Sequence, residues 1–465
     1  MAKHSAEELA QWQSLPLELK ERMSMQRIRD WIYEYDPDGV YVATSGGKDS
    51  TVLSDLVHRV SMESWGRDEI PRVFSNTGLE YPSVRVFANG MINAESVRPE
   101  LTFKQVITKH GYPVISKEVA ECVDASRKYI DSWNQNNKIL TDRQTDRQTD
   151  RQTDRQTDSC IVCAYAIADM IGINRRTDKE SYEKLKMGII PDDAFKFNVP
   201  VRVLNLLGEV PHTEKGEKTE EYSNMYDKSR YAYLLDAPFK ISNLCCNYMK
   251  KKPMKKYQKK TKRNPFVGTM AEESRLRKTQ WIKFGCNMFD AKYPASKPLS
   301  FWTEQDILQY IKKYNLKIAD AYGEVYYTDD AGFYYENPIV TDGLTLTTTK
   351  AKRTGCIFCM FGITQDRERF KILEQEEPKL CDYVMRGGEF DGEYWQPSES
   401  GLGYWFIIEW LNKFGNLNVY MPNREHYIET YSTDRTREIL GGQQVSNYEQ
   451  LLKLFSRRKN EVQSN

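Results

Sequence analysis

The sequence predicts an α/β fold, in which a parallel sheet is flanked by helices and a helical module is added at the C-terminal end. Two short segments, residues 40–43 and 72–75, have the length and composition of buried strands. Between them, apolar residues recur at helical spacing over residues 52–60. Because strand, helix and strand at this pace are typical of parallel sheets, we expect an α/β core.

The other elements follow from periodicity and from composition. Helical spacing of apolar residues predicts helices over residues 20–35 and 302–314. Residues 326–354 are rich in Tyr, Thr, Asp and Gly, which predicts hairpins or an irregular loop. From about Cys381 onward Trp, Tyr and Phe recur, and we expect a separate helical module with a final helix at 447–458.

The composition bounds the class of protein. The chain has 465 residues with 67 Lys and Arg against 66 Asp and Glu, so a protein that is basic overall is excluded, although a local basic patch is not. This length accommodates two or three structural units. No run of about 18 apolar residues occurs, and the first residues lack the apolar stretch of a secretory signal. We therefore expect a cytoplasmic protein with no membrane span.

A low-complexity repeat interrupts the chain. Residues 141–158 repeat Thr-Asp-Arg-Gln and have no apolar face, so we expect a solvated loop or a mobile helix. The tetranucleotide ACAG, repeated, encodes this tetrapeptide. We therefore hypothesise that polymerase slippage in such a tract switches expression on and off; a neutral expanded linker is the alternative. Mixed synonymous codons in the gene would exclude the tract.

A glycine-containing segment at the end of the first predicted strand has the chemistry of a phosphate-binding loop. Its glycines allow the backbone to approach a ligand closely, and exposed N–H groups at a helix start can hold pyrophosphate. A lysine adds positive charge, two serines can donate hydrogen bonds, and the aspartate suits a helix cap or a magnesium contact. The alternative is a tight turn that uses glycine for steric reasons alone. The segment is Ser45, Gly46, Gly47, Lys48, Asp49 and Ser50.

This segment resembles the SGGKDS signature of the PP-loop ATP pyrophosphatase superfamily, whose members split ATP between the α- and β-phosphates. Residues 76–82 resemble a nucleotide-pocket segment of the phosphoadenosine phosphosulfate (PAPS) reductase family, a branch of that superfamily. The resemblance implies an adenine nucleotide alpha hydrolase-like fold, ATP with Mg²⁺, and catalytic roles for Lys48, Asp49 and Ser50. It implies a nucleotide-binding set of Ser45, Gly46, Gly47, Lys48, Ser50, Thr77, Gly78, Glu80, Arg275 and Arg277.

Four cysteines form the pattern CC…CxxC: Cys245, Cys246, Cys356 and Cys359. Adjacent cysteines are awkward ligands for one tetrahedral zinc ion. The pattern resembles the one by which adenylyl-sulfate reductases and PP-loop proteins of DNA phosphorothioation hold a [4Fe–4S] cluster, for which thiolate ligands are suited. A zinc site and unligated buried thiols are the alternatives.

Further stretches extend the resemblance over residues 20–365, apart from the repeat. In residues 268–277 the match places Met270 where the family usually has arginine. Arg275 and Arg277 are implied to grip phosphate or sulfate oxygens, and an ordinary charged surface helix is the alternative. We expect four segments: a nucleotide-binding half at 1–140, the insertion at 141–158, the rest of the domain with the cysteine pattern at 159–365, and the helical module at 366–465.

Two departures bear on the reaction. Sulfonucleotide reductases end in a catalytic cysteine within Glu-Cys-Gly-x-His, which is missing here, and they usually lack the complete SGGKDS signature, which is present. Both departures favour an ATP-splitting enzyme. Cys160 and Cys163 form a CxxC pair that is a redox dithiol, a sulfur-carrying pair or, given its apolar neighbours, a pair of inert buried thiols.

The leading prediction is an enzyme that splits ATP to AMP and pyrophosphate, adenylates a substrate and supports sulfur transfer. One alternative is reduction of adenylyl sulfate or PAPS, with Cys381 or the pair Cys160 and Cys163 in place of the missing thiol. The other is a non-catalytic nucleotide-binding subunit of a defence complex. A lysine-rich run from Lys250 to Arg263 has nine basic residues and no acid, and is either a nucleic-acid contact or a solvated loop. A cysteine desulfurase or defence-complex subunits are the expected protein partners.

Overall fold

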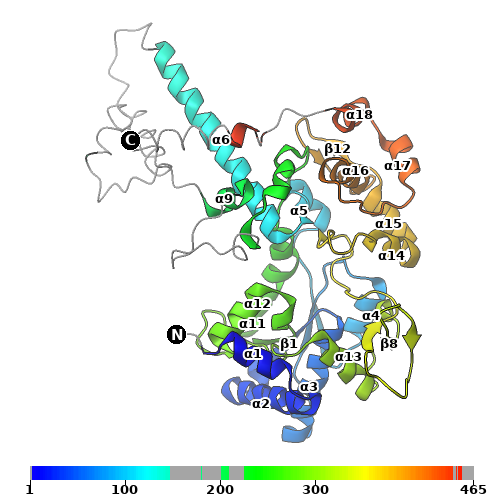
Figure 1. Ribbon diagram of the computed structural model, residues 1–465. Helices are drawn as coiled ribbons and strands as arrows, with labels where there is room; N and C mark the ends of the chain where they lie inside the picture. Colours follow the sequence, from blue (N-terminus) through cyan, green and yellow to red (C-terminus); the bar gives the residue numbers. More distant parts are fainter. Residues whose placement is uncertain are drawn as a thin grey trace. The chain divides into compact units, whose positions relative to one another are not determined.

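The computed structural model describes residues 3–146, 180, 200–208, 225–442, 447 and 449–452 (Figure 1). Contacts divide the chain into two compact units, each assembled from separate segments. The repeat at 141–158 is described only as far as residue 146, and Cys160 and Cys163 lie outside the described residues. Unit 1 comprises Met1–Lys109, Leu244–Cys359 and Ile372–Leu380; unit 2 comprises His110–Asn243, Met360–Lys371 and Cys381–Asn465.

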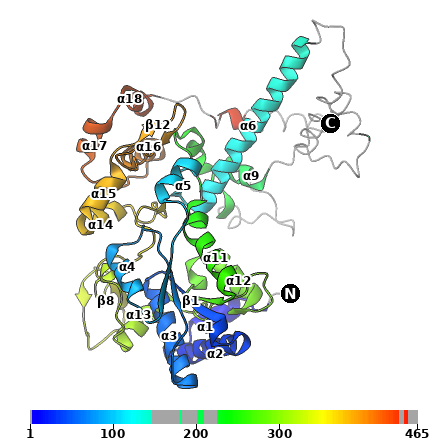
Figure 2. The ribbon, with the colours of Figure 1, turned by 180° about the vertical axis from the view of Figure 1, so that it is seen from behind.

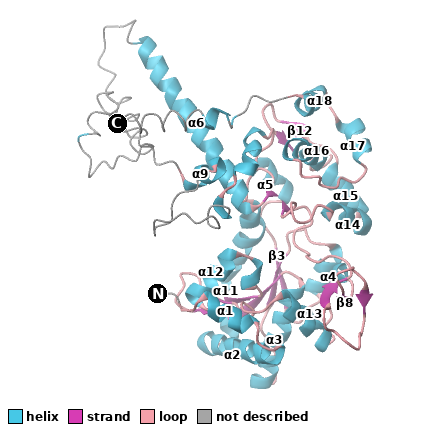
Figure 3. Ribbon diagram, in the orientation of Figure 1, coloured by secondary structure: helices cyan, strands magenta, loops and turns pink. Residues whose placement is uncertain are grey.

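A six-stranded sheet forms the centre of unit 1 (Figure 3). Its strands are β1 (Val40–Thr44), β2 (Arg72–Ser75), β3 (Ala94–Val97), β5 (Asn264–Val267), β6 (Asn287–Met288) and β7 (Ala295–Ser296). Their order is β3-β2-β1-β5-β7-β6, and every neighbouring pair is parallel except β6 with β7. The chain builds outward from β1 to β3 and then returns to the other side of β1. Ligands commonly bind at the carboxyl ends of strands at such a reversal.

Helices cover both faces of this sheet. Along β1, Val40 and Val42 point into a core shared with α2 (Leu17–Tyr35) and α3 (Lys48–Trp65). Tyr41 points to the opposite face, where it packs with Tyr257 of α11 (Lys252–Thr261). This alternation follows from the two-residue period of a strand. The predicted parallel sheet flanked by helices is therefore confirmed.

The N-terminal turn of α13 (Glu304–Lys313) is held firmly. The Thr303 hydroxyl accepts a hydrogen bond from the Asp306 amide, and the Asp306 carboxylate accepts one from the Thr303 amide. The same carboxylate lies 2.7 Å from the ammonium of Lys20 on α2, and both side chains are buried. This capping box and ion pair fix the position of Glu304, the first residue of the helix.

The remaining elements of unit 1 are shorter. Residues predicted as hairpins or an irregular loop form a three-stranded antiparallel sheet with the order β10-β8-β9. Its strands are β8 (Val325–Thr328), β9 (Tyr334–Tyr335) and β10 (Thr345–Thr348), and the helices not yet named are α1 (Ala6–Gln13), α4 (Pro82–Asn89) and α12 (Arg275–Phe284). A π-helical turn, η4 (Asn247–Lys251), leads directly into α11.

Unit 2 is mainly helical. The long helix α6 (Lys117–Asp146) packs against α9 (Val201–Leu207) and the 3₁₀ segment η3 (Ser229–Asp236) (Figure 2). Arg127 on α6 donates hydrogen bonds to the carbonyls of Leu234, Leu235, Ala237 and Phe239. The other elements are β4 (Val114–Ile115), β11 (Met360–Phe361), β12 (Glu389–Phe390), β13 (Trp395–Gln396), α16 (Tyr404–Gly415), α17 (Arg424–Tyr431) and α18 (Asp434–Gly441).

The C-terminal region is helical, as predicted. The chain passes between the segments of the two units at five points, and three of these lie within helices: α5 (Phe103–His110), α14 (Arg369–Glu376) and α15 (Pro378–Met385). The predicted final helix is described at 447 and 449–452, where the backbone is helical. In the described part of the chain, no helix has the length and apolar character needed to cross a membrane.

Candidate nucleotide and thiol site

Four consecutive amides of the loop between β1 and α3 point at hydroxyl oxygens. The Ser45 amide donates to Ser50 Oγ at 3.2 Å, and the Gly46 amide donates to Thr44 Oγ1 at 3.1 Å. The Gly47 amide donates to Ser45 Oγ at 3.3 Å, and the Lys48 amide donates to the Tyr322 hydroxyl at 3.2 Å. The four amides therefore gather at the start of a helix, where anions commonly bind, and in this structure the protein's own hydroxyl oxygens accept their hydrogen bonds.

Gly46 is required by the shape of this loop. Its φ of +70° is a conformation that side chains rarely adopt. A Cβ at this position would lie 2.8 Å from Val84 Cγ1 and 2.9 Å from the Val84 carbonyl, both on α4. The first glycine therefore lets the loop turn while α4 packs directly against it, as a ligand-binding loop and a purely steric turn would both require.

Lys48 is buried and held by two oxygens. Its ammonium lies 3.0 Å from Glu304 Oε1 and donates a hydrogen bond to the Lys352 carbonyl at 3.1 Å. Burial by itself lowers the pKa of this ammonium, but the carboxylates of Asp49 and Glu304 outweigh burial and raise the pKa. Lys48 is therefore a fixed positive charge at the base of the loop.

Asp49, Arg277 and Arg353 place further charges near the loop. Burial raises the pKa of Asp49, and the positive charges of Lys48, Arg277 and Arg353 act in the opposite direction. Its Oδ1 is buried and accepts no hydrogen bond from any residue that the structure describes. This oxygen lies 4.0 Å from the Lys48 ammonium. Mg²⁺ is usually held by one or two carboxylates together with substrate phosphates, so a carboxylate at this place suits a magnesium contact.

The two predicted arginines differ. Arg277 on α12 is half-buried, pairs with Glu273 and acts on Asp49 electrostatically. Burial lowers the pKa of its guanidinium. Arg275 is exposed on the first turn of the same helix. The structure therefore brings Arg277 to the loop.

The segment after β2 links the loop region to the cysteines. The Thr77 hydroxyl donates to Glu80 Oε1 at 2.6 Å and accepts from the Leu79 amide. Gly78 has a φ of +75° and turns the chain. The Ile357 amide, between Cys356 and Cys359, donates to the Leu79 carbonyl at 2.8 Å. The predicted nucleotide segment and the CxxC loop are therefore joined directly.

The four cysteines share one electrostatic neighbourhood. The pKa of Cys245 is raised by its hydrogen bond with Cys246, by burial, and by the charges of Cys246, Cys359 and Cys356. Burial also raises the pKa of Cys356, against the effect of Lys250. Cys245 and Cys246 begin the helical turn that continues through η4, a type of turn that is frequent at functional sites.

The thiols do not have a single-ion arrangement. Across residues 3–146, 200–208 and 225–442, no three His, Cys, Asp or Glu side chains are placed to hold one metal ion. A tetrahedral zinc site would need its sulfurs at about 2.3 Å from one point. Four thiolates are also the donor set of an iron–sulfur cluster, so the residue types fit such a group, whereas their placement in the described residues does not itself show a metal site.

The lysine-rich run divides into two parts. Lys250 donates a hydrogen bond to Cys356, whose charge is the largest of the influences that raise the pKa of Lys250. Arg263 is half-buried and contacts Tyr257 and Glu95. The lysines between them on and beside α11 are exposed: Lys251, Lys252, Lys255, Lys256, Lys259, Lys260 and Lys262. Two of them, Lys252 and Lys255, lie over the rings of Tyr248 and Tyr293.

The sequence did not single out several residues of the site. The Tyr322 hydroxyl accepts a hydrogen bond from the Lys48 amide, and it forms a second hydrogen bond of 2.6 Å with Thr354 Oγ1. Glu304 and Thr44 were likewise missed. Only Glu304 had a signal, since it follows the Thr303 cap of a predicted helix.

Comparison with protein families gives one match. A model of the phosphoadenosine phosphosulfate reductase domain matches residues 201–329. The match includes the first cysteine pair and α12, whereas the phosphate loop precedes it in the chain. No curated protein matches the sequence. The match supports the PAPS reductase family of the PP-loop superfamily, and with it an enzyme with a nucleotide-binding, sulfur-related function.

Proposed function

We propose that this protein cleaves ATP to AMP and pyrophosphate, adenylates an oxygen of its substrate, and supports sulfur transfer to that substrate. The observation that carries the proposal is the run of four loop amides, residues 45–48, gathered at the start of α3, where the Lys48 ammonium is also held. Arg277 and Arg353 add positive charge near Asp49. This concentration of donors suits a polyphosphate.

The proposed step is a displacement at the α-phosphorus. A substrate oxygen forms a bond to that phosphorus, and the bond between it and the bridging oxygen to the β-phosphate breaks. Pyrophosphate departs with the electron pair. The loop amides and Lys48 stabilise the charge that develops on it, because they are oriented before the reaction begins. Bound Mg²⁺ would neutralise pyrophosphate charge, with Asp49 as its protein ligand.

We propose that Cys245, Cys246, Cys356 and Cys359 hold a [4Fe–4S] cluster, which would supply sulfide or electrons near the adenylated substrate. The Lys250 ammonium lies among these thiols and offsets their negative charge. The hydrogen bond from Ile357 to Leu79 keeps the second cysteine pair beside the nucleotide segment. Sulfur chemistry and nucleotide chemistry would therefore take place in one part of unit 1.

Nucleic acid is the proposed substrate class. Within the residues that the structure describes, Lys256 pairs with Glu100 at 2.9 Å and no other exposed lysine of α11 forms an ion pair. Phosphate backbones are bound by such lysine arrays. Exposed tyrosine rings beside lysines, as at Tyr293, suit stacking with bases.

The family match favours a second candidate, reduction of adenylyl sulfate or PAPS. That reaction needs a thiolate that attacks sulfur. Cys381 is a poor substitute, because it is buried and its thiol donates to the Phe370 carbonyl at 3.8 Å.

Product analysis separates these functions. The anaerobically purified chain is incubated with Mg²⁺, nucleic acid and ATP labelled in the α-phosphate, and in parallel with adenylyl sulfate and PAPS. Labelled AMP or an AMP adduct, with pyrophosphate, is the expected result. Sulfite release would establish the reductase instead, and nucleotide binding without any product would establish a non-catalytic subunit.

A further inference from the structure

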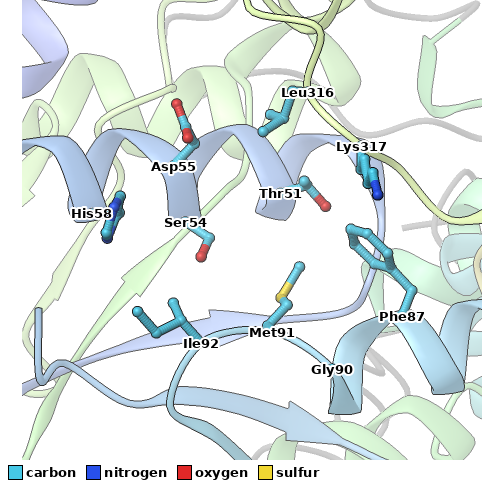
Figure 4. Close-up of a pocket in the computed structure, with 10 residues that line it drawn as sticks. All are labelled: Thr51, Ser54, Asp55, His58, Phe87, Gly90, Met91, Ile92, Leu316 and Lys317. Carbon is cyan, nitrogen blue, oxygen red and sulfur yellow. The ribbon is translucent and has the colours of Figure 1, made fainter.

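A pocket of about 500 Å³ lies along the side of α3 in unit 1 (Figure 4). Small-molecule sites commonly have volumes of about 300–1,000 Å³. Along α3 the pocket extends from Thr51 to His58. These residues follow the phosphate loop and the predicted catalytic residues on the same helix. It is lined by Thr51, Ser54, Asp55 and His58 of α3, by Phe87, Gly90, Met91 and Ile92, and by Leu316 and Lys317.

The walls of this pocket suit a flat ring. Phe87, Met91, Ile92 and Leu316 give it a mainly apolar lining. Aromatic rings stack on phenylalanine and make favourable contacts with methionine sulfur. In Figure 4 the side chains of Ser54 and Met91 point toward one another across the space. A planar molecule between them would be covered on both sides.

Two polar groups of the pocket are held in place from behind. Ser54 Oγ accepts a hydrogen bond from Arg72 Nε at 2.9 Å, which leaves its hydroxyl proton to donate to a ligand. Arg72 is paired with buried Asp68 at 2.7 Å, and Asp68 lies 2.9 Å from His58 Nδ1. The second ring nitrogen of His58 therefore remains for a ligand. These two groups select a ring with nitrogen or oxygen atoms over a pure hydrocarbon.

One lining residue, Thr51, contacts the phosphate loop, and a second, Met91, contacts Thr44, the strand residue that precedes it. Thr51 Oγ1 donates to the Gly47 carbonyl at 3.0 Å, and Thr44 Oγ1 donates to Met91 Sδ at 3.6 Å. Thr44 Oγ1 in turn accepts a hydrogen bond from the Gly46 amide. A molecule that displaced Met91 or drew Thr51 away would alter the contacts of two loop residues.

We propose that this pocket is an effector site for a small, uncharged heteroaromatic compound, and that its occupancy changes the conformation of the phosphate loop. The coupling to ATP rests on the proposed function, whereas binding to the pocket and the loop response do not. By linkage, a compound that changes ATP affinity is itself bound with an affinity that ATP changes by the same factor.

Benzimidazole is a suitable probe because it is a planar heteroaromatic ring without phosphate or ribose. Its binding is measured by calorimetry and by saturation-transfer NMR on the full chain. Hydrogen exchange of the peptide that spans residues 44–51 reports the loop, and ATP affinity is measured with and without the probe. We expect slower or faster exchange of that peptide and a change in ATP affinity of about fivefold or more.

Two variants locate the site. Gly90→Phe should fill the pocket, since a Cβ at this position meets only two carbonyls, at 3.4 and 3.6 Å. It should weaken probe binding about tenfold or more, a change of about 1.4 kcal/mol. Val86→Phe adds the same ring to an exposed neighbour on α4 and should leave probe binding unchanged. Phe87→Ala, which removes a wall, provides a second test if Gly90→Phe does not fold.

Each outcome decides the proposal. Probe binding that is kept in Lys48→Ala and lost in Gly90→Phe, with altered loop exchange, supports it. Absence of binding to the native chain, complete competition by ATP at the phosphate loop, or binding without any loop response would overturn it. A loop response in a chain that binds no ATP would refute the proposed function and leave the effector site standing.

Discussion

The ammonium of Lys48 and the carboxylate of Glu304 lie 3.0 Å apart, although 255 residues separate them in the chain. Glu304 is the first residue of α13, whose N-terminal turn is fixed by the capping box of Thr303 and the ion pair of Asp306 with Lys20. The phosphate loop therefore holds its lysine against an internal anion. A bound phosphate would have to share or replace that anion.

Replacement of Glu304 by glutamine should strengthen ATP binding. The change removes a negative charge that both competes for Lys48 and repels phosphate. A partly exposed ion pair contributes up to about 1 kcal/mol, so we expect Kd to fall by up to about fivefold. Calorimetry with ATP checks this, with Glu324→Gln as the control. Weaker binding would mean that Glu304 assists the nucleotide, for example through Mg²⁺.

The cysteine proposal makes a spectroscopic prediction. Protein purified without oxygen should be brown, with broad visible absorbance and about four iron and four sulfide per chain. Cys356→Ser should lose this absorbance. Cys286→Ser changes another buried cysteine of unit 1, outside the CC…CxxC pattern, and should keep it. Colourless protein that carries zinc would contradict the cluster.

The buried pair of Arg72 and Asp68 should make the stability of the protein sensitive to acid. Burial raises the pKa of Asp68, but the hydrogen bond and charge of Arg72 outweigh this and hold the pKa below its usual value of 3.8. A lowered pKa stabilises the fold at pH above the usual value. That stabilisation is lost as the pH falls through the lowered pKa.

Asp68→Asn should therefore lower the free energy of unfolding at neutral pH by about 3–5 kcal/mol, because Arg72 is left buried without its partner. Urea denaturation between neutral pH and pH 3 measures this loss of unfolding free energy. It also tests whether the stability of the variant depends less on pH than that of the native protein. Asp434→Asn removes an exposed partner of Arg437 and should cost less than about 1 kcal/mol. Equal effects of the two substitutions would contradict the assignment.

The exposed lysines of α11 should contribute to nucleic-acid binding through phosphate charge. Lys255→Gln with Lys259→Gln should weaken binding to duplex and single-stranded oligonucleotides of any sequence. The slope of log K against log salt should become shallower by about 1–2. The pair Lys371→Gln and Lys379→Gln, elsewhere on the surface, is the control. An unchanged slope in the α11 variant would show that this face does not bind nucleic acid.

Local sequence was sufficient to predict the framework of the site. Residues 40–44 and 72–75 are strands because apolar and β-branched side chains follow one another there, and Gly46, with its positive φ, is needed by the backbone itself. Such features depend on near neighbours along the chain. They were therefore predicted correctly without knowledge of the tertiary contacts.

The partners of the loop depend on tertiary contacts. Tyr322 reaches the Lys48 amide from 274 residues away, and no local pattern marks it. Lys250 belongs to a run of lysines that resembles a solvated face, yet its ammonium contacts Cys356. The sequence showed the charge and could not show which lysine is turned inward.

Pyrophosphate binding tests the central claim most directly, because it needs neither the substrate nor the cluster. Calorimetry with inorganic pyrophosphate and Mg²⁺ is performed on the native chain, on Lys48→Ala, and on Lys379→Ala as the control. We predict saturable binding at one site in the native chain and the control, and a loss of about tenfold or more in Lys48→Ala. Equal affinity in all three proteins, or no binding to the native chain, would contradict the account.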